Sequence, residues 1–352
     1  MYQSECLYQS EEENLVPETA QQVIVTVVNS RVEQLAKSLG SLPLAADFAA
    51  QMTPVAPVPD EEAFRAYLWT AAVCHATKGG LAGVFGEQRF KGWDFLLRAF
   101  SAQAAADASV LSPQNMSAFT AADLLRLLTS HSTDTQVNLT DLDRRAAILR
   151  TTAEELLRTF DGRVTTLLGR ADQRAGGLTG AYALLEQLSA FQDPLQKKSS
   201  AFLMTVHFSK RWTIRDQDSI QPMIDYHRMR VLLRTGCIEI GDPRTAQRLR
   251  AQLPVEPELE TEIRRISLDV CSKLPGLADM PMFDFDVLLW AHARSCCRHE
   301  PMCVSRKAEN DSFGSYLDMA DSTRCVFEGW CPGSVKAETR AYWEPIVATE
   351  NY

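Results

Sequence analysis

Helical spacing of apolar side chains is the feature that most limits what this chain can fold into. Between residues 118 and 192 the apolar positions recur as they do on the buried stripe of amphipathic helices. Thr120 and Thr140 each precede such a run and are suited to cap its first turn. We find no alternation of apolar and polar residues over six positions and no repeat at a fixed spacing. The sequence therefore predicts an all-α fold with short 3₁₀ or hairpin pieces at most.

Composition shifts divide the chain into four expected parts. These are a disordered acidic tail (1–16), an N-terminal helical lobe (17–177), a catalytic helical segment (178–252), and C-terminal helices with a cysteine-rich loop (253–352). The N-terminal lobe is expected to begin with a helix over 17–39 that Gly40 ends.

The charge is unevenly distributed along the chain. The formal net charge is −9, yet residues 197–250 hold 11 Lys and Arg against 5 Asp and Glu, a local excess of +6. This basic stretch is either a phosphate-binding or nucleic-acid-binding patch or a solvated helical face. No run approaches the ~18 apolar residues of a membrane helix, and the acidic N-terminus resembles neither a secretory signal nor a transit peptide. We therefore expect a cytoplasmic protein without a membrane partner.

The stretch 193–230 places an amine and a carboxylate at the starts of two successive helices. Lys197 and Lys198 open an apolar helical run after a DP turn, and Asp225 follows in the segment PMIDYH. A lysine at such a helix start is partly desolvated and feels the positive helix end, and both effects lower its pKa. The pair suits chemistry at an anomeric carbon, where the amine attacks and the carboxylate stabilises the developing positive charge. Alternatively, the lysines lie in solvent and Asp225 only caps its helix.

Four other side chains are candidates for binding a substrate. His227 and Arg228 lie in the helix that the PMIDYH segment opens, and Trp212 is suited to stack on a base. Trp93 lies among basic residues in the run GEQRFKGWDFLLRAF, where it either faces a ligand or anchors a loop onto the core. We interpret His75 as a hydrogen-bonded core histidine.

The order of turn, lysine, apolar helix and P-M-I-D-Y-H resembles the helix-hairpin-helix superfamily of DNA glycosylases, nearest to its all-helical 8-oxoguanine branch. The resemblance implies a two-lobed helical enzyme that excises a modified purine from DNA, with AP lyase activity in the bifunctional members. In that family the matching lysine is the Schiff-base nucleophile and the matching aspartate assists it. These roles fall on Lys198 and Asp225, with Lys197 as the alternative one position away.

The cysteines give a second resemblance to the same superfamily. Five of the nine cysteines lie between Cys296 and Cys331, which favours a metal site over a disulfide framework. The run LLWAHARSCCRHEPMC resembles the approach to the iron–sulfur loop of endonuclease III-type members, C-x6-C-x2-C-x5-C, with the middle gap grown to 21 residues. The resemblance implies a [4Fe–4S] cluster or zinc on four thiolates, with Cys297 as a spare or a substitute for the first. These four are Cys296, Cys303, Cys325 and Cys331. The alternative is that several of them are buried small hydrophobes.

A third resemblance is to the queuosine-nucleotide glycosidases, through a similar helix start, Asp225-Tyr226-His227 and Glu262-Ile263-Arg264. The glycine-containing hairpin with which typical DNA glycosylases hold a phosphate is absent, because LSAFQDPLQKK stands in its place. Three hypotheses follow. The first is excision of an 8-oxoguanine-type base from DNA. The second is cleavage of a small queuosine- or deazaguanine-type nucleotide, and the third is a non-catalytic accessory role, as in antiphage defence.

Overall fold

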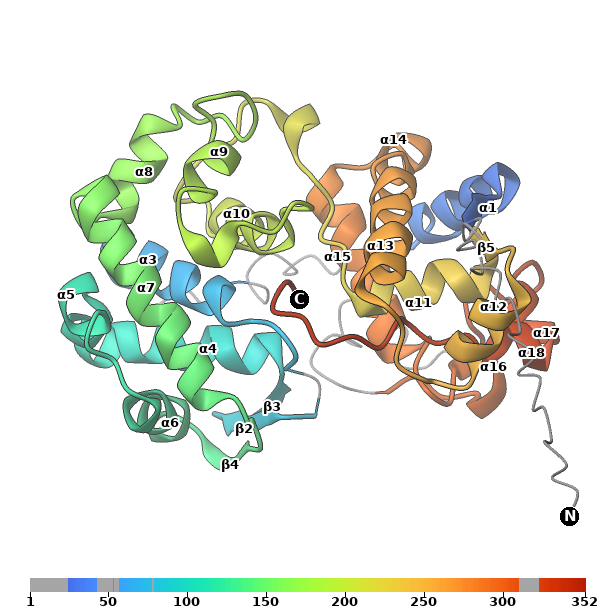
Figure 1. Ribbon diagram of the computed structural model, residues 1–352, viewed down its shortest axis with the longest axis horizontal. Coiled ribbons are helices and arrows are strands. Elements are labelled where there is room, and N and C mark those ends of the chain that lie inside the picture. The colour runs from blue at the N-terminus through green and yellow to red at the C-terminus, as the bar shows by residue number, and fades with distance from the viewer. Residues whose placement is uncertain (1–24, 43–52, 54–56, 78, 310–322) are drawn as a thin grey trace, which may run out of the picture.

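The computed structural model describes residues 25–42, 53, 57–77, 79–309 and 323–352, and most of its elements are helices (Figure 1). The expected acidic tail (1–16) lies outside the described residues. The longer helices are α1 (Asn29–Gly40), α3 (Asp60–Ala72), α4 (Trp93–Asp107), α6 (Ala121–Ser130), α7 (Leu142–Phe160), α10 (Lys197–Phe208), α11 (Tyr226–Thr235), α12 (Pro243–Arg250), α13 (Pro257–Cys271) and α15 (Met282–Ser295). The shorter ones are α5 (Pro113–Met116), α8 (Val164–Arg170), α9 (Ala181–Leu185), α14 (Leu274–Ala278), α16 (Met302–Ser305), α17 (Pro332–Val335) and α18 (Ala337–Arg340).

Two small antiparallel sheets accompany the helices, so the fold is mainly helical rather than purely α. Strand β1 (Val25–Val27) pairs with β5 (Ile238–Ile240), and β2 (Leu81–Phe85) lies between β3 (Gln88–Lys91) and β4 (Thr133–Val137). The strands have three to five residues, too few to show the six-residue alternation by which a strand is found in a sequence. Because β1 occupies part of the range 17–39, the described part of the helix expected there begins only at residue 29.

The buried apolar residues form two separate cores, which define two lobes on the left and right of Figure 1. The first lobe (57–223) contains α3 to α10, and the second lobe (25–42 and the described part of 224–352) contains α1 and α11 to α18. The chain passes from one core to the other between Met223 and Ile224. The next residue is Asp225, so the aspartate expected in the active site stands at the point where the chain crosses between the lobes.

Helix α15 packs against both lobes. Phe283, Val287 and Ala291 belong to the first core, whereas Phe285, Leu289 and Ala293 belong to the second. Each set recurs every four residues, so the two sets occupy different faces of one helix. A helix that is apolar on both faces is stable only when it is buried on both. Helix α15 is therefore the element that holds the two cores together.

The cross-lobe segment (residues 341–352) spans the gap between the lobes, where Figure 1 draws it in red. On the second lobe, Arg234 donates to the backbone oxygen of Tyr342 at 2.9 Å. On the first lobe, the backbone N–H of Ala76 donates to the oxygen of Tyr352 at 3.1 Å. The segment thereby fixes one edge of the space between the lobes.

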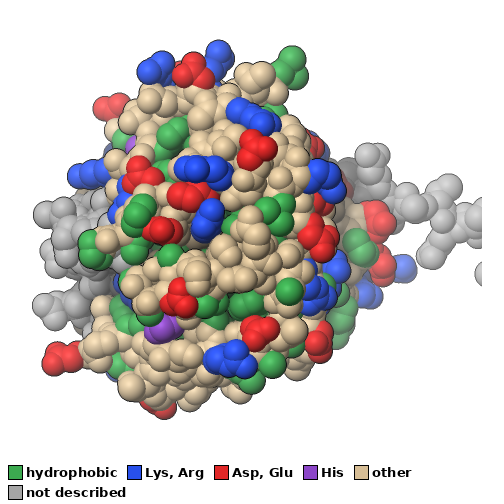
Figure 2. All heavy atoms as spheres, turned by 90° about the vertical axis from the view of Figure 1, so that its left-hand side faces the viewer, with side chains coloured by type: hydrophobic (Ala, Val, Ile, Leu, Met, Phe, Trp, Pro, Cys, Tyr) green, Lys and Arg blue, Asp and Glu red, His purple; other side chains and the backbone are tan. Residues whose placement is uncertain are grey.

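The basic stretch of 197–250 does not form a surface patch as a whole. Five of its cations are buried: Lys197, Lys198, Arg228, Arg230 and Arg234. On the face of the first lobe shown in Figure 2, basic and acidic side chains are interspersed. None of the helices in the described ranges combines the length and the apolar composition that crossing a bilayer requires.

Candidate active site

A cavity of about 680 Å³ lies between the two lobes and receives side chains from both. The first lobe contributes Cys74, Lys91, Trp93 and Lys197, and the start of α11 contributes Asp225, Tyr226, His227, Arg228 and Arg230. The remaining wall comes from α15 with the residues after it, and from the cross-lobe segment. These are Trp290, Arg294, Arg298, His299, Glu300, Glu309, Trp343 and Tyr352.

Lys197 reaches this cavity from the first turn of α10. Its backbone N–H donates to the carboxylate of Asp193 at 3.0 Å, so the helix start is capped from the preceding turn. Its ammonium donates to the sulfur of Cys74 at 3.0 Å, and the residue is only 8% exposed. Within the described ranges no carboxylate lies within ion-pairing distance of this ammonium. A buried lysine without a counterion is unusual in a structural role, since buried charges are normally paired.

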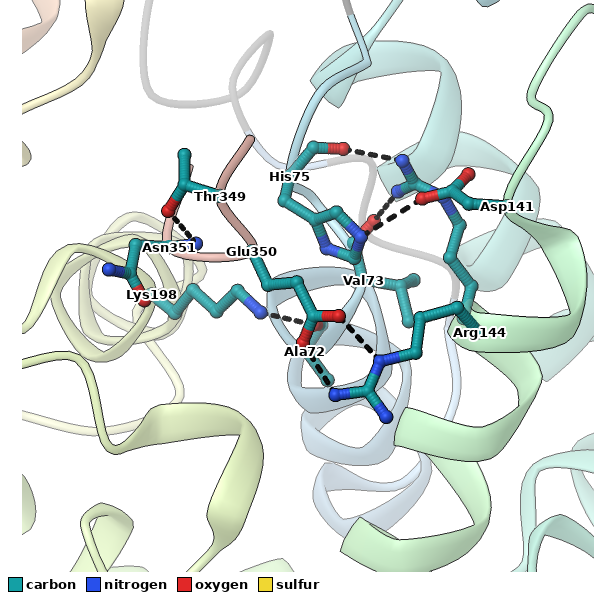
Figure 3. Close-up of polar contacts among 10 residues, drawn as sticks. Ala72, Val73, His75, Asp141, Arg144, Lys198, Thr349, Glu350 and Asn351 are labelled. Atoms are coloured by element: carbon teal, nitrogen blue, oxygen red, sulfur yellow. Dashed lines mark hydrogen bonds and ion pairs between the residues drawn. The ribbon is translucent and has the colours of Figure 1, made fainter. Parts of the chain in front are cut away.

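Lys198 is directed away from the cavity, because consecutive residues of a helix point about 100° apart. Figure 3 shows its amine beside the backbone oxygen of Ala72, to which it donates at 2.8 Å, with Glu350 close by. Burial, assisted by the charges of Lys197 and Arg145, lowers the pKa of Lys198 to about 8. Lys198 is absent from the cavity wall, so of the two adjacent lysines it is Lys197 that shares this cavity with Asp225.

Asp225 caps the N-terminus of α11, as its position in the PMIDYH segment predicts. Its carboxylate accepts the backbone N–H of Arg228 at 3.1 Å and pairs with the guanidinium of the same residue at 3.2 Å. Arg228 also forms a buried ion pair with Asp286, to which its Nε donates at 2.9 Å. These contacts hold one carboxylate at the cavity wall in a fixed orientation.

The rest of the wall combines aromatic rings with cations. Arg294 pairs with Asp94 at 3.0 Å and lies over the ring of Trp290 at 5.2 Å. Arg298 forms an ion pair with Glu309 at 3.2 Å, and Glu309 also forms an ion pair with Lys91 at 3.0 Å. The cavity therefore offers flat apolar surfaces for a ring system, and guanidinium groups whose positions are fixed by ion pairs as donors to polar groups of a ligand.

Among the predicted substrate-binding residues, three of four line this cavity: Trp93, His227 and Arg228. The indole N–H of Trp93 is buried and has no hydrogen-bond partner in the described part of the chain. His227 shares a hydrogen bond of 2.9 Å with Arg230. Trp212 instead packs, half-buried, against the first core and is not part of the wall. His75 is buried and contacts Asp141 at 3.2 Å, in agreement with its interpretation as a core histidine (Figure 3).

Sequence reasoning missed the contribution of α15 and the cross-lobe segment to the wall. The run LLWAHARSCCRH was interpreted only through its cysteines. A signal was present, because Trp290, Arg294 and Arg298 recur every four residues and would share one face of a helix. For Trp343 and Tyr352 we find no signal in the sequence that would have placed them at the cavity.

The cysteines gather at a different place. Cys296, Cys303, Cys325 and Cys331, together with Cys297, line a second cavity of about 20 Å³. Burial raises the pKa of Cys331 to about 11. As they are arranged, no three His, Cys, Asp or Glu side chains of the described residues form a group that could hold a metal ion. A zinc ion or an iron–sulfur cluster at these residues stays a prediction.

A comparison with models of protein families gives a match. A family model described as "Queuosine salvage protein" matches residues 81–276, which is more than half of the chain. The matched region contains Lys197 and Asp225 with the turn and the helix that position each of them. The comparison with curated proteins found no match.

Proposed function

Because this chain belongs to the queuosine salvage protein family, we propose that it cleaves the N-glycosidic bond of a small queuosine- or deazaguanine-type nucleoside or nucleotide. The family match favours this hypothesis over excision of 8-oxoguanine from DNA, which the comparisons do not support. The absence of the glycine hairpin and the burial of five cations of the basic stretch favour a small substrate as well.

The observation that carries the proposal is the meeting of Lys197 and Asp225 at one cavity from two different lobes. A substrate in this cavity would touch an amine on one side and a carboxylate on the other. The amine has no carboxylate partner among the described residues, and the carboxylate is held by a helix N-terminus and Arg228. This combination is suited to a reaction in which positive charge develops on a sugar.

In the proposed reaction, the Lys197 ammonium first gives one proton to water, and the neutral amine then attacks the anomeric carbon while the bond from that carbon to the base breaks. The electron pair of the broken bond goes to the base, which leaves with the proton released by the amine. Asp225 stabilises the oxocarbenium-like charge on the sugar as the bond lengthens. Water then displaces the amine from the sugar, which restores Lys197 and completes a hydrolysis.

The wall residues have defined roles in binding. We assign the base to the aromatic surfaces of Trp93, Trp290 and Trp343, where stacking is favourable. Arg294 and Arg298 are each held by an ion pair, with Asp94 and Glu309, and their further N–H groups are donors for a phosphate oxygen.

The test is release of free base from queuosine and from its 5′-phosphate, followed by mass spectrometry. We expect release by the natural protein, and loss of release in Lys197→Gln and Asp225→Asn. Lys198→Gln is the matched control. The amide of the new glutamine can still donate to the backbone oxygen of Ala72, and the residue is not part of the cavity wall. An oligonucleotide with 8-oxoguanine is the competing substrate. Base release from DNA alone, or undiminished release by Asp225→Asn, would contradict the proposal.

The accessory-protein hypothesis would be favoured if both lysines pointed into solvent. Both are buried, with Lys197 at 8% and Lys198 at 3% exposure, so this observation gives that hypothesis no support.

A further inference from the structure

A buried ion pair, Asp193 with Arg264, connects the two helix starts that carry the proposed active site. Asp193 belongs to the turn before α10 in the first lobe, and Arg264 belongs to α13 in the second lobe. The guanidinium contacts both carboxylate oxygens, one of them at 2.8 Å. Asp193 is 6% exposed and Arg264 is 3% exposed, so the pair lies inside the seam between the lobes.

The carboxylate of Asp193 sets the start of α10. It accepts the backbone N–H of Leu195 at 3.1 Å and that of Lys197 at 3.0 Å. Because two backbone donors and a guanidinium converge on it, the carboxylate has one orientation relative to Lys197. Burial alone would raise the pKa of Asp193, but the hydrogen bonds and charge of Arg264 outweigh burial and lower it. The carboxylate is therefore ionised at neutral pH.

The guanidinium of Arg264 makes its third contact beside Asp225. Its Nε donates to the backbone oxygen of Ile224 at 3.3 Å, and Ile224 is the residue immediately before Asp225. Its planar face lies over the ring of Tyr352, at 5.0 Å from the centroid, and Tyr352 is part of the cavity wall. One side chain thus touches the turn before Lys197, the residue before Asp225 and the wall between them.

From this geometry we propose that Asp193 and Arg264 are positioning residues that set the separation of the Lys197 amine and the Asp225 carboxylate across the lobe seam. The inference rests on the proposed glycosidase function. Neither residue lines the cavity, so both act through the residues they hold. The guanidinium of an arginine contacts both carboxylate oxygens at once and so fixes the distance and the angle between the two side chains. The single ammonium of a lysine fixes only a distance.

The test uses two conservative substitutions in the full chain. Arg264→Lys keeps the charge and removes the fork, and Asp193→Asn keeps an acceptor for the Lys197 N–H and removes the charge. The matched controls are Arg65→Lys and Glu61→Gln. Glu61 pairs with Arg65 at 2.8 Å and accepts the backbone N–H of Val164 at 3.0 Å at the start of α8, away from the cavity.

We expect kcat to fall by about 10²-fold in Arg264→Lys and Asp193→Asn, because a displacement of about 1 Å has that effect on a positioned reaction. KM should stay within about threefold, since the residues that touch the ligand are unchanged. The controls should keep kcat. Unchanged kcat in both test variants, or unfolding of both below the assay temperature while the controls stay folded, would overturn the inference.

A second readout does not depend on activity. Lysines are methylated with formaldehyde and dimethylamine-borane, and peptide mass spectrometry gives the rate at each. The rate at Lys197 is divided by the rate at the exposed Lys273, which serves as the reference. We expect the ratio of the two rates to change severalfold in Arg264→Lys and Asp193→Asn and to stay constant in the controls. A constant ratio in all four variants would overturn the inference. If the natural protein releases no base, the proposed function fails, and this ratio still decides whether the pair positions Lys197.

Discussion

Replacing Lys198 with methionine should stabilise the protein at pH 7 and destabilise it at pH values above 10.5. Lys198 is 3% exposed, and its amine donates to the backbone oxygen of Ala72 at 2.8 Å. Burial is the largest cause that lowers the pKa of Lys198 from 10.5 to about 8, and neighbouring positive charges add to it. The folded protein must therefore hold a buried charge at neutral pH.

The magnitude follows from the two pKa values. Between pH 8 and 10.5 the unfolded chain binds a proton that the folded chain does not, so the unfolding free energy rises with pH across this window. Each pKa unit corresponds to about 1.4 kcal/mol, so the buried charge destabilises the folded state by about 3 kcal/mol at pH 7. Methionine removes this cost and loses one hydrogen bond, which is worth about 1 kcal/mol. The variant should be about 2 kcal/mol more stable at pH 7 and about 1 kcal/mol less stable above pH 10.5.

The assay is urea unfolding of the natural protein and Lys198→Met at pH 7, 8.5 and 10, followed by tryptophan fluorescence. Lys273→Met, at an exposed position, is the control and should show no such trend. The difference in unfolding free energy between the natural protein and Lys198→Met should shrink steadily from pH 8 upward. A difference that is constant from pH 7 to 10, or a variant that is less stable at pH 7, would refute the reasoning.

Three further predictions concern the cavity and the cysteines. Cys74→Ala removes the sulfur that accepts from Lys197 at 3.0 Å, so kcat for base release should fall more than KM rises. Steady-state kinetics on the nucleotide would contradict this if only KM changed. Trp93→Phe keeps a ring and removes a buried N–H that no described residue accepts, so the unfolding free energy should not fall by the ~1 kcal/mol that a lost hydrogen bond costs. A fall of ~1 kcal/mol or more in urea unfolding of the variant would contradict this. The metal hypothesis expects one zinc or four iron ions per chain after anaerobic purification, and a band near ~400 nm for a cluster. If the purified protein contains no metal, and a chelator does not lower its thermal stability, the metal hypothesis is excluded.

The helices and the two helix starts of the site could be predicted because local rules decide them. Thr120 caps α6 in a reciprocal arrangement with Asp123, and Asp225 caps α11. Thr140 was expected to cap α7, but the helix begins at Leu142. Asp141 stands at the helix start instead, where it binds Arg145 one turn later at 2.8 Å and makes a tertiary contact with His75 at 3.2 Å.

The sequence could not predict which of the two lysines points into the cavity, because this depends on the rotation of α10 about its axis. Almost every residue of α10 is buried, so no single apolar stripe marks its rotation, which brings Lys197 to the cavity and Lys198 to Ala72. Sequence alone gives the helix start but not its phase relative to a partner lobe. The hairpin of β2 and β3 left a weak signal in Gly86, whose φ of 63° suits the first position of a two-residue loop.

The proposed chemistry and the ligand-binding wall come from different parts of the chain. Lys197, Asp225 and the Asp193–Arg264 pair all lie within 81–276, the region that matches the family model. Much of the aromatic and cationic wall lies after it: Trp290, Arg294, Arg298, Trp343 and Tyr352. Arg230, inside the matched region, pairs with Glu344 at 2.7 Å and so fixes the cross-lobe segment to α11. A change at Trp290, Arg294 or Arg298 can therefore alter which ligand is bound without moving the amine or the carboxylate, whereas a change at Tyr352 also removes a contact of Arg264.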